Sequence, residues 1–141
     1  MNDTAVETRP HFSFALMHAA QAVGDKLESV LNEIGLSMAK QSALTQLAQA
    51  GEPLTLSDLA ARLSCVRSNI TQLVDRLEAD GLVRRVDDAS DRRSVRAELT
   101  ATGKEKQKAG ALAMEGAQKD LSERLSARDL SALETALGVF S

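Results

Sequence analysis

The chain of 141 residues is long enough for one domain with a substantial core and too short for two large ones. Its net charge of −3 excludes a polycation, and its single cysteine excludes an intrachain disulfide. It shows no leader-like or membrane-length apolar segment, so we expect a cytoplasmic chain without a membrane partner.

The N-terminal part is predicted to be helical after a short tail. Residues 1–10 are polar and lack periodicity, which favours a flexible tail. From residue 12 to residue 34, apolar side chains form one broad helical face, and alanines on it permit close approach of another helix. A second helix is expected over residues 37–49, ending before Gly51.

Two short amphipathic helices follow, separated by a turn. Their apolar residues recur at spacings of three and four: Leu56, Leu59, Ala60 and Leu63 in the first helix, and Ile70, Leu73, Val74 and Leu77 in the second. Ser64, Cys65 and Val66 form a turn of the length that sets two helices at the steep angle of a helix-turn-helix. Cys65 is either an oxidant sensor or, as free cysteines commonly are, a small buried apolar residue.

Polar side chains cover the outward face of the second helix: Arg67, Ser68, Asn69, Thr71, Gln72 and Arg76. In a major groove, Arg pairs with guanine, Asn or Gln pairs with adenine, and Ser and Thr contact phosphates or base edges. A solvated helix face would show the same residue types, so this helix alone does not decide between the two interpretations.

A β-hairpin is predicted next, with strands over residues 82–86 and 94–99 and a loop over residues 87–93. The tip of this wing carries Asp91, Arg92 and Arg93. A carboxylate can hold an Arg in the orientation that fits a narrow, electronegative minor groove. The alternative is a solvated turn with a local ion pair, which at under about 1 kcal/mol gives little reason for the arrangement.

Charge is unevenly distributed along the chain. Residues 54–99 hold eight arginines, no lysine and eight acidic residues, so the net charge of −3 comes from the remainder. Arg is suited to planar, bidentate contacts. The equal numbers of basic and acidic residues favour a protein that recognises a specific DNA sequence. Such a protein would bind weakly as a single copy and would depend on two half-sites.

Two more helices are expected at the C-terminus. The first runs from Thr100, a candidate N-cap, to about residue 125, and the second begins at Ser126. In the second, apolar residues repeat at spacings of four and three: Leu130, Leu133, Leu137 and Phe140. The terminal helices carry more apolar surface than the small module can cover, which predicts a homodimer with half-sites about 10 base pairs apart.

An ordered set of motifs runs from about Ala15 to the C-terminus: Gly35-Leu36-Ser37 with Gln41 and Leu44, Asp58-Leu59-Ala60 with Leu63, Ile70-Thr71, Leu73-Val74-Asp75-Arg76-Leu77-Glu78, Gly81-Leu82-Val83, Asp91-Arg92-Arg93 and Leu99-Thr100-Ala101-Thr102-Gly103. In order and spacing this set resembles the MarR family of winged-helix transcriptional regulators. One departure is Val66, where the family tends to place a small polar residue, because Val cannot cap a helix through its side chain.

The resemblance implies a mainly α fold with a small β-hairpin wing (α+β). It implies a winged helix-turn-helix over residues 36–99 that binds DNA, and dimerisation helices over residues 11–35 and 100–141. It also implies a homodimer on a pseudo-palindromic duplex, usually acting as a repressor that a small ligand or an oxidant releases.

The resemblance further implies roles for single residues. Four side chains would enter the major groove, with one Arg beside them and one near the backbone: Ser68, Asn69, Thr71 and Gln72, then Arg67 and Arg76. Asp91 would orient Arg93 into the minor groove. A small aromatic or phenolic effector would lie between the winged module and the dimer helices. Its candidate lining residues are Leu16, Met17, Met38 and Leu47, which core packing explains equally well.

Catalytic and metal sites are not indicated. No phosphate loop, nucleophile elbow or triad spacing is visible, and no close His, Cys, Asp or Glu pair has ligand spacing, so we expect neither an enzyme nor a cofactor. Two classes remain, a dimeric DNA-binding regulator and a winged-helix module that binds protein or RNA. Aromatic residues make up 2% of the chain, without Trp or Tyr, which favours duplex over single-stranded nucleic acid.

Overall fold

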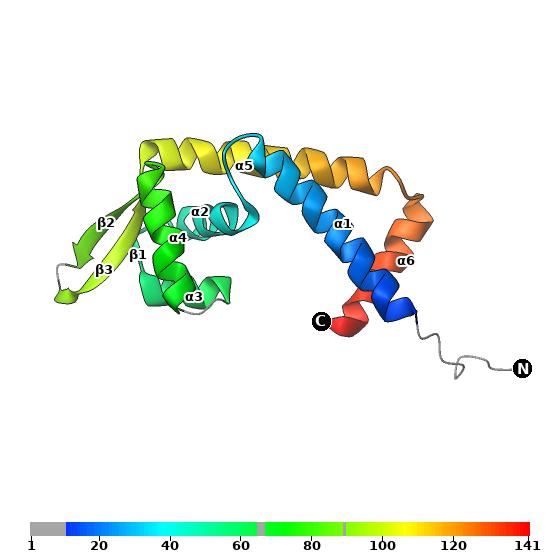
Figure 1. The fold of residues 1–141 in the computed structure, drawn as a ribbon, viewed down its shortest axis with the longest axis horizontal. Coiled ribbons are helices and arrows are strands. Elements are labelled where there is room, and N and C mark those ends of the chain that lie inside the picture. Colours follow the sequence, from blue (N-terminus) through cyan, green and yellow to red (C-terminus); the bar gives the residue numbers. More distant parts are fainter. Residues whose placement is uncertain (1–10, 65–66, 89) are drawn as a thin grey trace, which may run out of the picture.

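The computed structural model describes residues 11–64, 67–88 and 90–141. Its helices and strands are α1 (Phe12–Asn32), α2 (Met38–Ala50), β1 (Leu54–Thr55), α3 (Leu56–Leu63), α4 (Arg67–Ala79), β2 (Val83–Asp88), β3 (Asp91–Leu99), α5 (Ala101–Ser122) and α6 (Ala127–Leu137), with a short 3-10 turn at Gly138–Phe140 (Figure 1). The fold is mainly helical with one small antiparallel sheet, so the predicted fold class is confirmed. The tail predicted at residues 1–10 lies outside the described residues.

Polar side chains fix the starts of four helices. The hydroxyls of Ser37 and Thr55 accept hydrogen bonds from backbone N–H groups in the first turns of α2 and α3, at 3.1 and 3.0 Å. Thr100 and Ser126 cap α5 and α6 in the same way, as predicted. Gly51 ends α2 in the left-handed conformation, with φ of 69°, which glycine adopts without strain.

The sheet has the strand order β1-β3-β2, and both strand pairs are antiparallel. β2 and β3 pair from Val83 opposite Leu99 to Asp88 opposite Asp91, with an irregularity between Asp87 and Asp88. The sequence pattern does not predict β1, because a strand of two residues is too short to show alternation.

The hairpin is longer than the sequence predicts. The expected loop over residues 87–93 is wrong, because residues 87 and 88 belong to β2 and residues 91–93 begin β3. Strands pair through main-chain groups, so the ladder continues through these charged residues whatever their side chains are. The triplet Asp91-Arg92-Arg93 therefore starts a strand and does not form the tip.

One hydrophobic core lies among α2, α3, α4 and the sheet. Its main side chains, each at most 7% exposed, are Leu44, Leu47, Leu54, Leu56, Leu59, Ile70, Val74, Leu77, Val83 and Ala97. The terminal helices, all of whose residues are described, are covered far less. α1 buries Leu31 alone, α5 buries small residues, and α6 buries no side chain.

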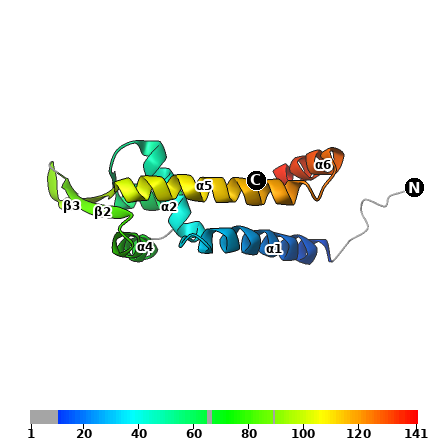
Figure 2. The same cartoon turned by 90° about the horizontal axis from the view of Figure 1, so that it is seen from above.

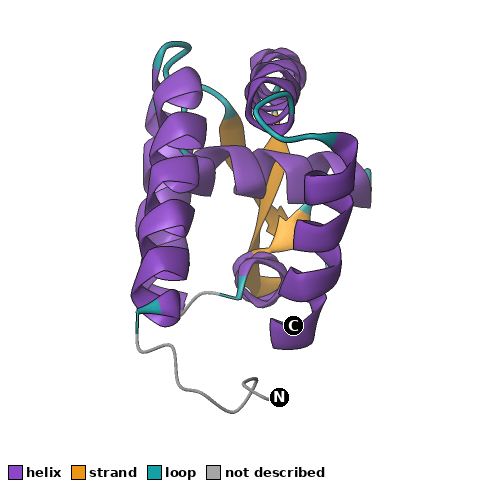
Figure 3. Ribbon diagram, turned by 90° about the vertical axis from the view of Figure 1, so that its right-hand side faces the viewer, coloured by secondary structure: helices purple, strands orange, loops and turns teal. Residues whose placement is uncertain are grey.

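The well-packed and poorly covered parts occupy opposite ends of the molecule. α1 packs along α5, and α6 lies at the end of α5 remote from the sheet (Figures 1 and 2). In the view from that remote end, the strands lie behind the helices (Figure 3). The sheet and α4 thus share one end, and α6 stands at the other.

Candidate nucleic-acid interface

Helix α4 has one buried face and one exposed face. Its apolar residues Ile70, Val74 and Leu77 have no measurable exposure, so the helix is held firmly against the core. The predicted contact residues that the structure describes all lie exposed on its other sides: Asn69, Thr71, Gln72 and Arg76. A rigid helix that presents amide, hydroxyl and guanidinium groups is suited to reading base edges.

The start of α4 is only partly described. The helix begins at Arg67, so Arg67, Ser68 and Asn69 occupy its first turn. The side chains of Arg67 and Ser68, and the turn residues Cys65 and Val66, lie outside the described part. The base-reading roles of the first two residues and the two interpretations of Cys65 therefore stay predictions.

A cluster around Asp88 closes the hairpin. One carboxylate oxygen accepts hydrogen bonds from the backbone N–H of Ser90 at 3.0 Å and from its hydroxyl at 2.8 Å. The other accepts from Nη2 of Arg96 at 3.1 Å, and Nη1 of Arg96 donates to the carbonyl of Pro53 at 3.4 Å. This aspartate cluster joins the hairpin end to the segment before β1.

Sequence reasoning assigned the acid–arginine pair of the wing to Asp91 and Arg93, whose side chains, like that of Arg92, lie outside the described part. It missed Asp88 and Arg96. A signal was present, because an aspartate two residues before a serine in a turn commonly accepts hydrogen bonds from it.

The hydrogen bond from the backbone N–H of Ser90, then that from its hydroxyl, holds the pKa of Asp88 below its ordinary value. A carboxyl with a lowered pKa adds stability that is present above about pH 3.9, its ordinary value, and is lost as the pH falls through the folded-state pKa. We expect the protection factors of the hairpin amides, which correct hydrogen exchange for its intrinsic slowing in acid, to fall on acidification in this window. Asp88→Asn should flatten this response, whereas Asp87→Asn, at the exposed neighbour, should leave it unchanged. An equal response in both variants would place the sensitivity elsewhere.

A second ionic cluster fastens the hairpin to α4. Nη2 of Arg85 in β2 lies 2.6 Å from Oδ1 of Asp75, and Nη1 lies 2.7 Å from Oε1 of Glu78. The backbone N–H of Arg85 also donates to Glu78, at 3.1 Å, and lowers the pKa of that carboxyl. Arg85 thus couples the orientation of the wing to that of α4, and sequence reasoning missed it because the pairing requires the tertiary fold.

Of the arginines in the module whose side chains are described, two remain available for an external anion. Arg62 on α3 and Arg76 on α4 form no ion pair with another described residue, and both are exposed. Arg84, Arg85 and Arg96 are paired with acids. Among the arginine side chains of the module that the structure describes, the unpaired ones therefore lie on the two helices of the helix-turn-helix, where they can contact phosphates.

The four predicted effector-lining residues do not share one cavity in the described part of the chain. Met17 and Met38 line a cavity of about 480 Å³ between α1 and α2. Leu47 belongs to the core and lines a different cavity, and Leu16 lines neither. The separation has a simple cause, because nine residues along α2 place Met38 and Leu47 on opposite sides of the helix.

Other kinds of site receive no support within the described ranges. No group of three or more His, Cys, Asp or Glu side chains there could hold a metal ion. None of the helices described has the length and hydropathy needed to cross a membrane.

A helix-turn-helix followed by a hairpin, flanked by long terminal helices, defines a winged helix-turn-helix protein. The chain belongs to the MarR family, whose model matches residues 36–95. The HTH-type transcriptional regulator YkoM of Bacillus subtilis, itself uncharacterized, is 31% identical over 104 residues, which cover 74% of this chain and 67% of YkoM. The chain spans about three fifths of the length of the first curated relatives it matches.

Solved structures show the same fold. AbsC of Streptomyces coelicolor, a MarR family transcriptional regulator, is 28% identical with a TM-score of 0.76, over 93% of this chain and 91% of AbsC. A mutant of Escherichia coli MarR, complexed with operator DNA, has a TM-score of 0.78 at 22% identity, over 99% of both chains. The relatives are transcriptional regulators and not enzymes, as expected for this chain.

Proposed function

We propose that the chain is a sequence-specific regulator that binds double-stranded DNA as a homodimer on a pseudo-palindromic operator, as a repressor that a ligand or an oxidant releases. The observation that carries this proposal is the exposed polar face of α4. The opposite, apolar face of this helix packs against the core, and the ion pairs of Arg85 join the helix to the hairpin. The operator complex of the structurally similar MarR supports duplex DNA as the partner. Such a regulator would act in the cytoplasm, where the DNA lies.

The residue types on α4 support base reading over general charge attraction. Asn69 and Gln72 carry the amide groups that pair with adenine, and Arg76 carries a free guanidinium. The wing, with Arg93 near its end, would reach the neighbouring minor groove. A protein-binding or RNA-binding winged module remains the alternative, and an absence of sequence preference would favour it.

The terminal helices support the homodimer. Large apolar side chains are exposed on α1, α6 and the final turn, including Phe14 at 69%, Leu133 and Leu137 at 42% each, and Phe140 at 65%. α6 has 11 residues and buries none of them within the chain. A helix of that length is marginal in water by itself, so a second copy is needed to cover it. Residues 11–35 and 100–141 would form the dimerisation region, and residues 36–99 the DNA-binding region.

An effector would act through the cavities beside α2. A groove of about 480 Å³ between α2, α3 and α4 is lined by Met38 and also by Asn69, Gln72 and Arg76 of the proposed contact face. A small aromatic or phenolic ligand there would touch the same side chains that read DNA. Met38 also lines the cavity beside α1, so the two hollows adjoin the same residue.

Gln72→Ala is expected to weaken binding to the specific operator by about 1 to 3 kcal/mol, because a base-reading amide would be lost. Binding to a random duplex should change little. Fluorescence anisotropy with both duplexes measures the two effects, and Gln118→Ala, an exposed glutamine on α5, is the matched control. An equal loss on both duplexes would reassign Gln72 to a backbone contact.

Arg93→Ala is expected to weaken operator binding by a similar amount, about 1 to 3 kcal/mol, without altering the dimer or its melting temperature. The reason is the proposed insertion of this guanidinium into the minor groove. Arg124→Ala, outside the winged module, provides the control. Unchanged operator affinity together with a native melting curve would remove the minor-groove role of Arg93.

A further inference from the structure

The outer part of the hairpin extends past the strand that attaches it to the rest of the molecule. Among the described strands, β1 pairs with β3 only where Leu54 lies opposite Ala97 and Thr55 lies opposite Arg96. The earlier residues of β3 therefore have no partner in β1, and the hairpin projects beyond the helices in Figures 1 and 2. We call residues 87–88 and 90–95 the projecting segment. Arg96 stands at its base.

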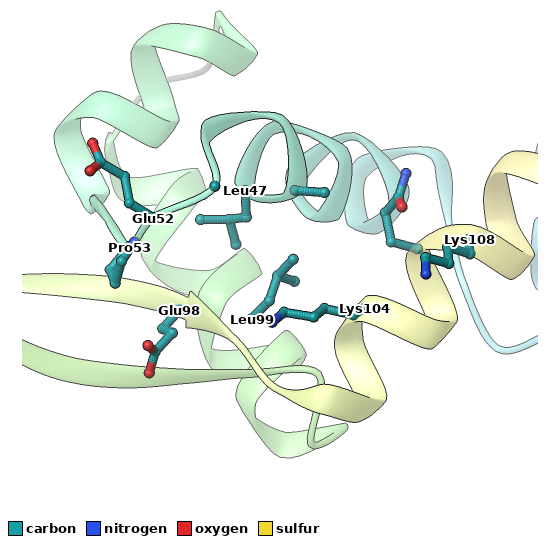
Figure 4. A pocket seen from close by; sticks show the side chains of 10 residues that line it. Leu47, Glu52, Pro53, Glu98, Leu99, Lys104 and Lys108 are labelled. Carbon is teal, nitrogen blue, oxygen red and sulfur yellow. The ribbon is translucent and has the colours of Figure 1, made fainter.

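The side chains of β3 alternate between two faces of the sheet. Val95, Ala97 and Leu99 pack in or against the core. In the close view, Leu99 points toward α2, whereas Glu98 points to the other side of the strand (Figure 4). Arg96 is two residues from Glu98, so it shares this outer face of the sheet.

Arg96 connects the projecting segment to the chain before β1. Its Nη2 and Nε lie 3.1 and 3.3 Å from Oδ2 of Asp88, at the end of β2. Its Nη1 donates to the carbonyl oxygen of Pro53 at 3.4 Å. Because β3 is the central strand, one guanidinium reaches partners on both sides of it. A planar guanidinium holds such a geometry better than a single point charge does.

Asp88 is itself held in place. Its other carboxylate oxygen accepts two hydrogen bonds from Ser90, and 14% of its side chain is exposed. The pair of Arg84 with Glu98 on the same outer face differs, because Arg84 is 64% exposed and its pair joins β2 to β3 within the hairpin. Of these two arginines, Arg96 alone binds a residue outside the hairpin.

A small rotation at the base of the projecting segment has a large effect at its far end. The strand from Arg96 back to Asp91 spans five residue steps, or about 17 Å. A rotation of about 10° at Arg96 would displace the far end by about 3 Å, which is about half the width of a B-DNA minor groove. A side chain displaced that far loses its hydrogen bond. The direction of the hairpin therefore decides whether its end can reach a fixed target.

We propose that Arg96 is a positioning residue for DNA recognition. It fixes the direction of the projecting segment, so that the end of the hairpin reaches the minor groove at a set distance from α4. Arg96 does not contact the DNA itself, because its guanidinium is occupied by Asp88 and Pro53. This role rests on the proposed function, in which the wing enters the minor groove. Arg85 supplies a second attachment, to α4.

Residual dipolar couplings of the backbone amides in the free chain test the attachment without DNA. In the wild type, the projecting segment and α4 should fit one rigid orientation. In Arg96→Met, the couplings of the projecting segment should decrease and no longer fit that orientation, while those of α4 should not change. Arg84→Met, the matched control, should behave as the wild type does. Wild-type couplings in Arg96→Met would overturn the proposal.

A double-mutant cycle with Arg93 tests the role in DNA binding. Arg96→Met should weaken operator binding at least about fivefold, the lower bound for a lost contact at the wing. In the Arg93→Ala background, the same substitution should weaken binding less than about twofold, because the contact that Arg96 positions is already absent. Arg96→Lys should recover part of the loss, and Arg84→Met should bind as the wild type does.

Failure of this role and failure of the proposed function give different results. Equal losses from Arg96→Met with and without Arg93 would overturn the positioning role, provided that the melting temperature matches that of the wild type. A lowered melting temperature with unchanged dipolar couplings would overturn it as well. A wild-type chain without operator preference would refute the proposed function, whereas the dipolar couplings would still decide whether Arg96 fixes the hairpin.

Discussion

Gly103→Ala is expected to destabilise the chain by about 3 kcal/mol, the largest effect on stability expected of a single small substitution here. Gly103 lies in the first turn of α5, where a Cβ would collide with the carbonyl oxygen of Leu82 and lie 2.9 Å from its carbonyl carbon. That backbone cannot move away easily, because the oxygen accepts a hydrogen bond from the N–H of Thr100 at 3.1 Å. Urea unfolding followed by circular dichroism measures the loss.

Gly116→Ala is the matched control for this substitution. Gly116 lies in the same helix, and a Cβ there would meet no atom within 4 Å. Replacing a helical glycine by alanine at an open position stabilises by about 0.5 to 1 kcal/mol. The two variants should therefore shift stability in opposite directions. A Gly103→Ala chain as stable as the wild type would contradict the close contact between α5 and Leu82.

Replacing Leu133 and Leu137 together by Asp is expected to convert the proposed homodimer to a monomer and to weaken operator binding by about 100-fold or more. Both leucines are 42% exposed within one chain. Aspartate at the two positions would bring carboxylates into the interface with a second copy, and removing these charges from water is unfavourable. Two linked half-site contacts typically exceed a single contact in affinity by about 10² to 10⁴. Sedimentation equilibrium measures the assembly, and anisotropy measures the affinity.

The double variant Ser131→Asp/Thr135→Asp is the control for the effect of added charge on α6. Both residues are exposed in the same helix and are polar already. This control should remain dimeric and bind the operator as the wild type does. A Leu133/Leu137 variant that stays dimeric would show that α6 is not part of the dimer interface.

The helices could be predicted from the sequence because their signals are local. The apolar repeat of Ile70, Val74 and Leu77 identified α4, and the hydroxyls of Thr100 and Ser126 marked the starts of α5 and α6. A repeat of three or four residues requires no knowledge of the rest of the fold. The exposed contact face of α4 followed directly from the position of its buried face.

The hairpin and its ionic contacts could not be predicted in the same way. The pairing of Asp88 with Asp91 depends on strand register, which the side chains of the loop do not reveal. Arg85 meets Asp75 only after β2 has folded back along α4. The sequence could not show which candidate effector residues share a cavity, because Met38 and Leu47 lie on opposite sides of one helix and line different cavities.

Specific recognition of duplex DNA is the central claim, and anisotropy titration tests it most directly. The probes are the duplex upstream of the chain's own coding sequence and a shuffled duplex of equal length, at about 50 and 200 mM salt. We expect the upstream duplex to bind at least about 100-fold more tightly, and the preference to persist at the higher salt while binding to the shuffled duplex is lost. Equal affinity for both duplexes at both salt concentrations, or binding to neither, would contradict the account.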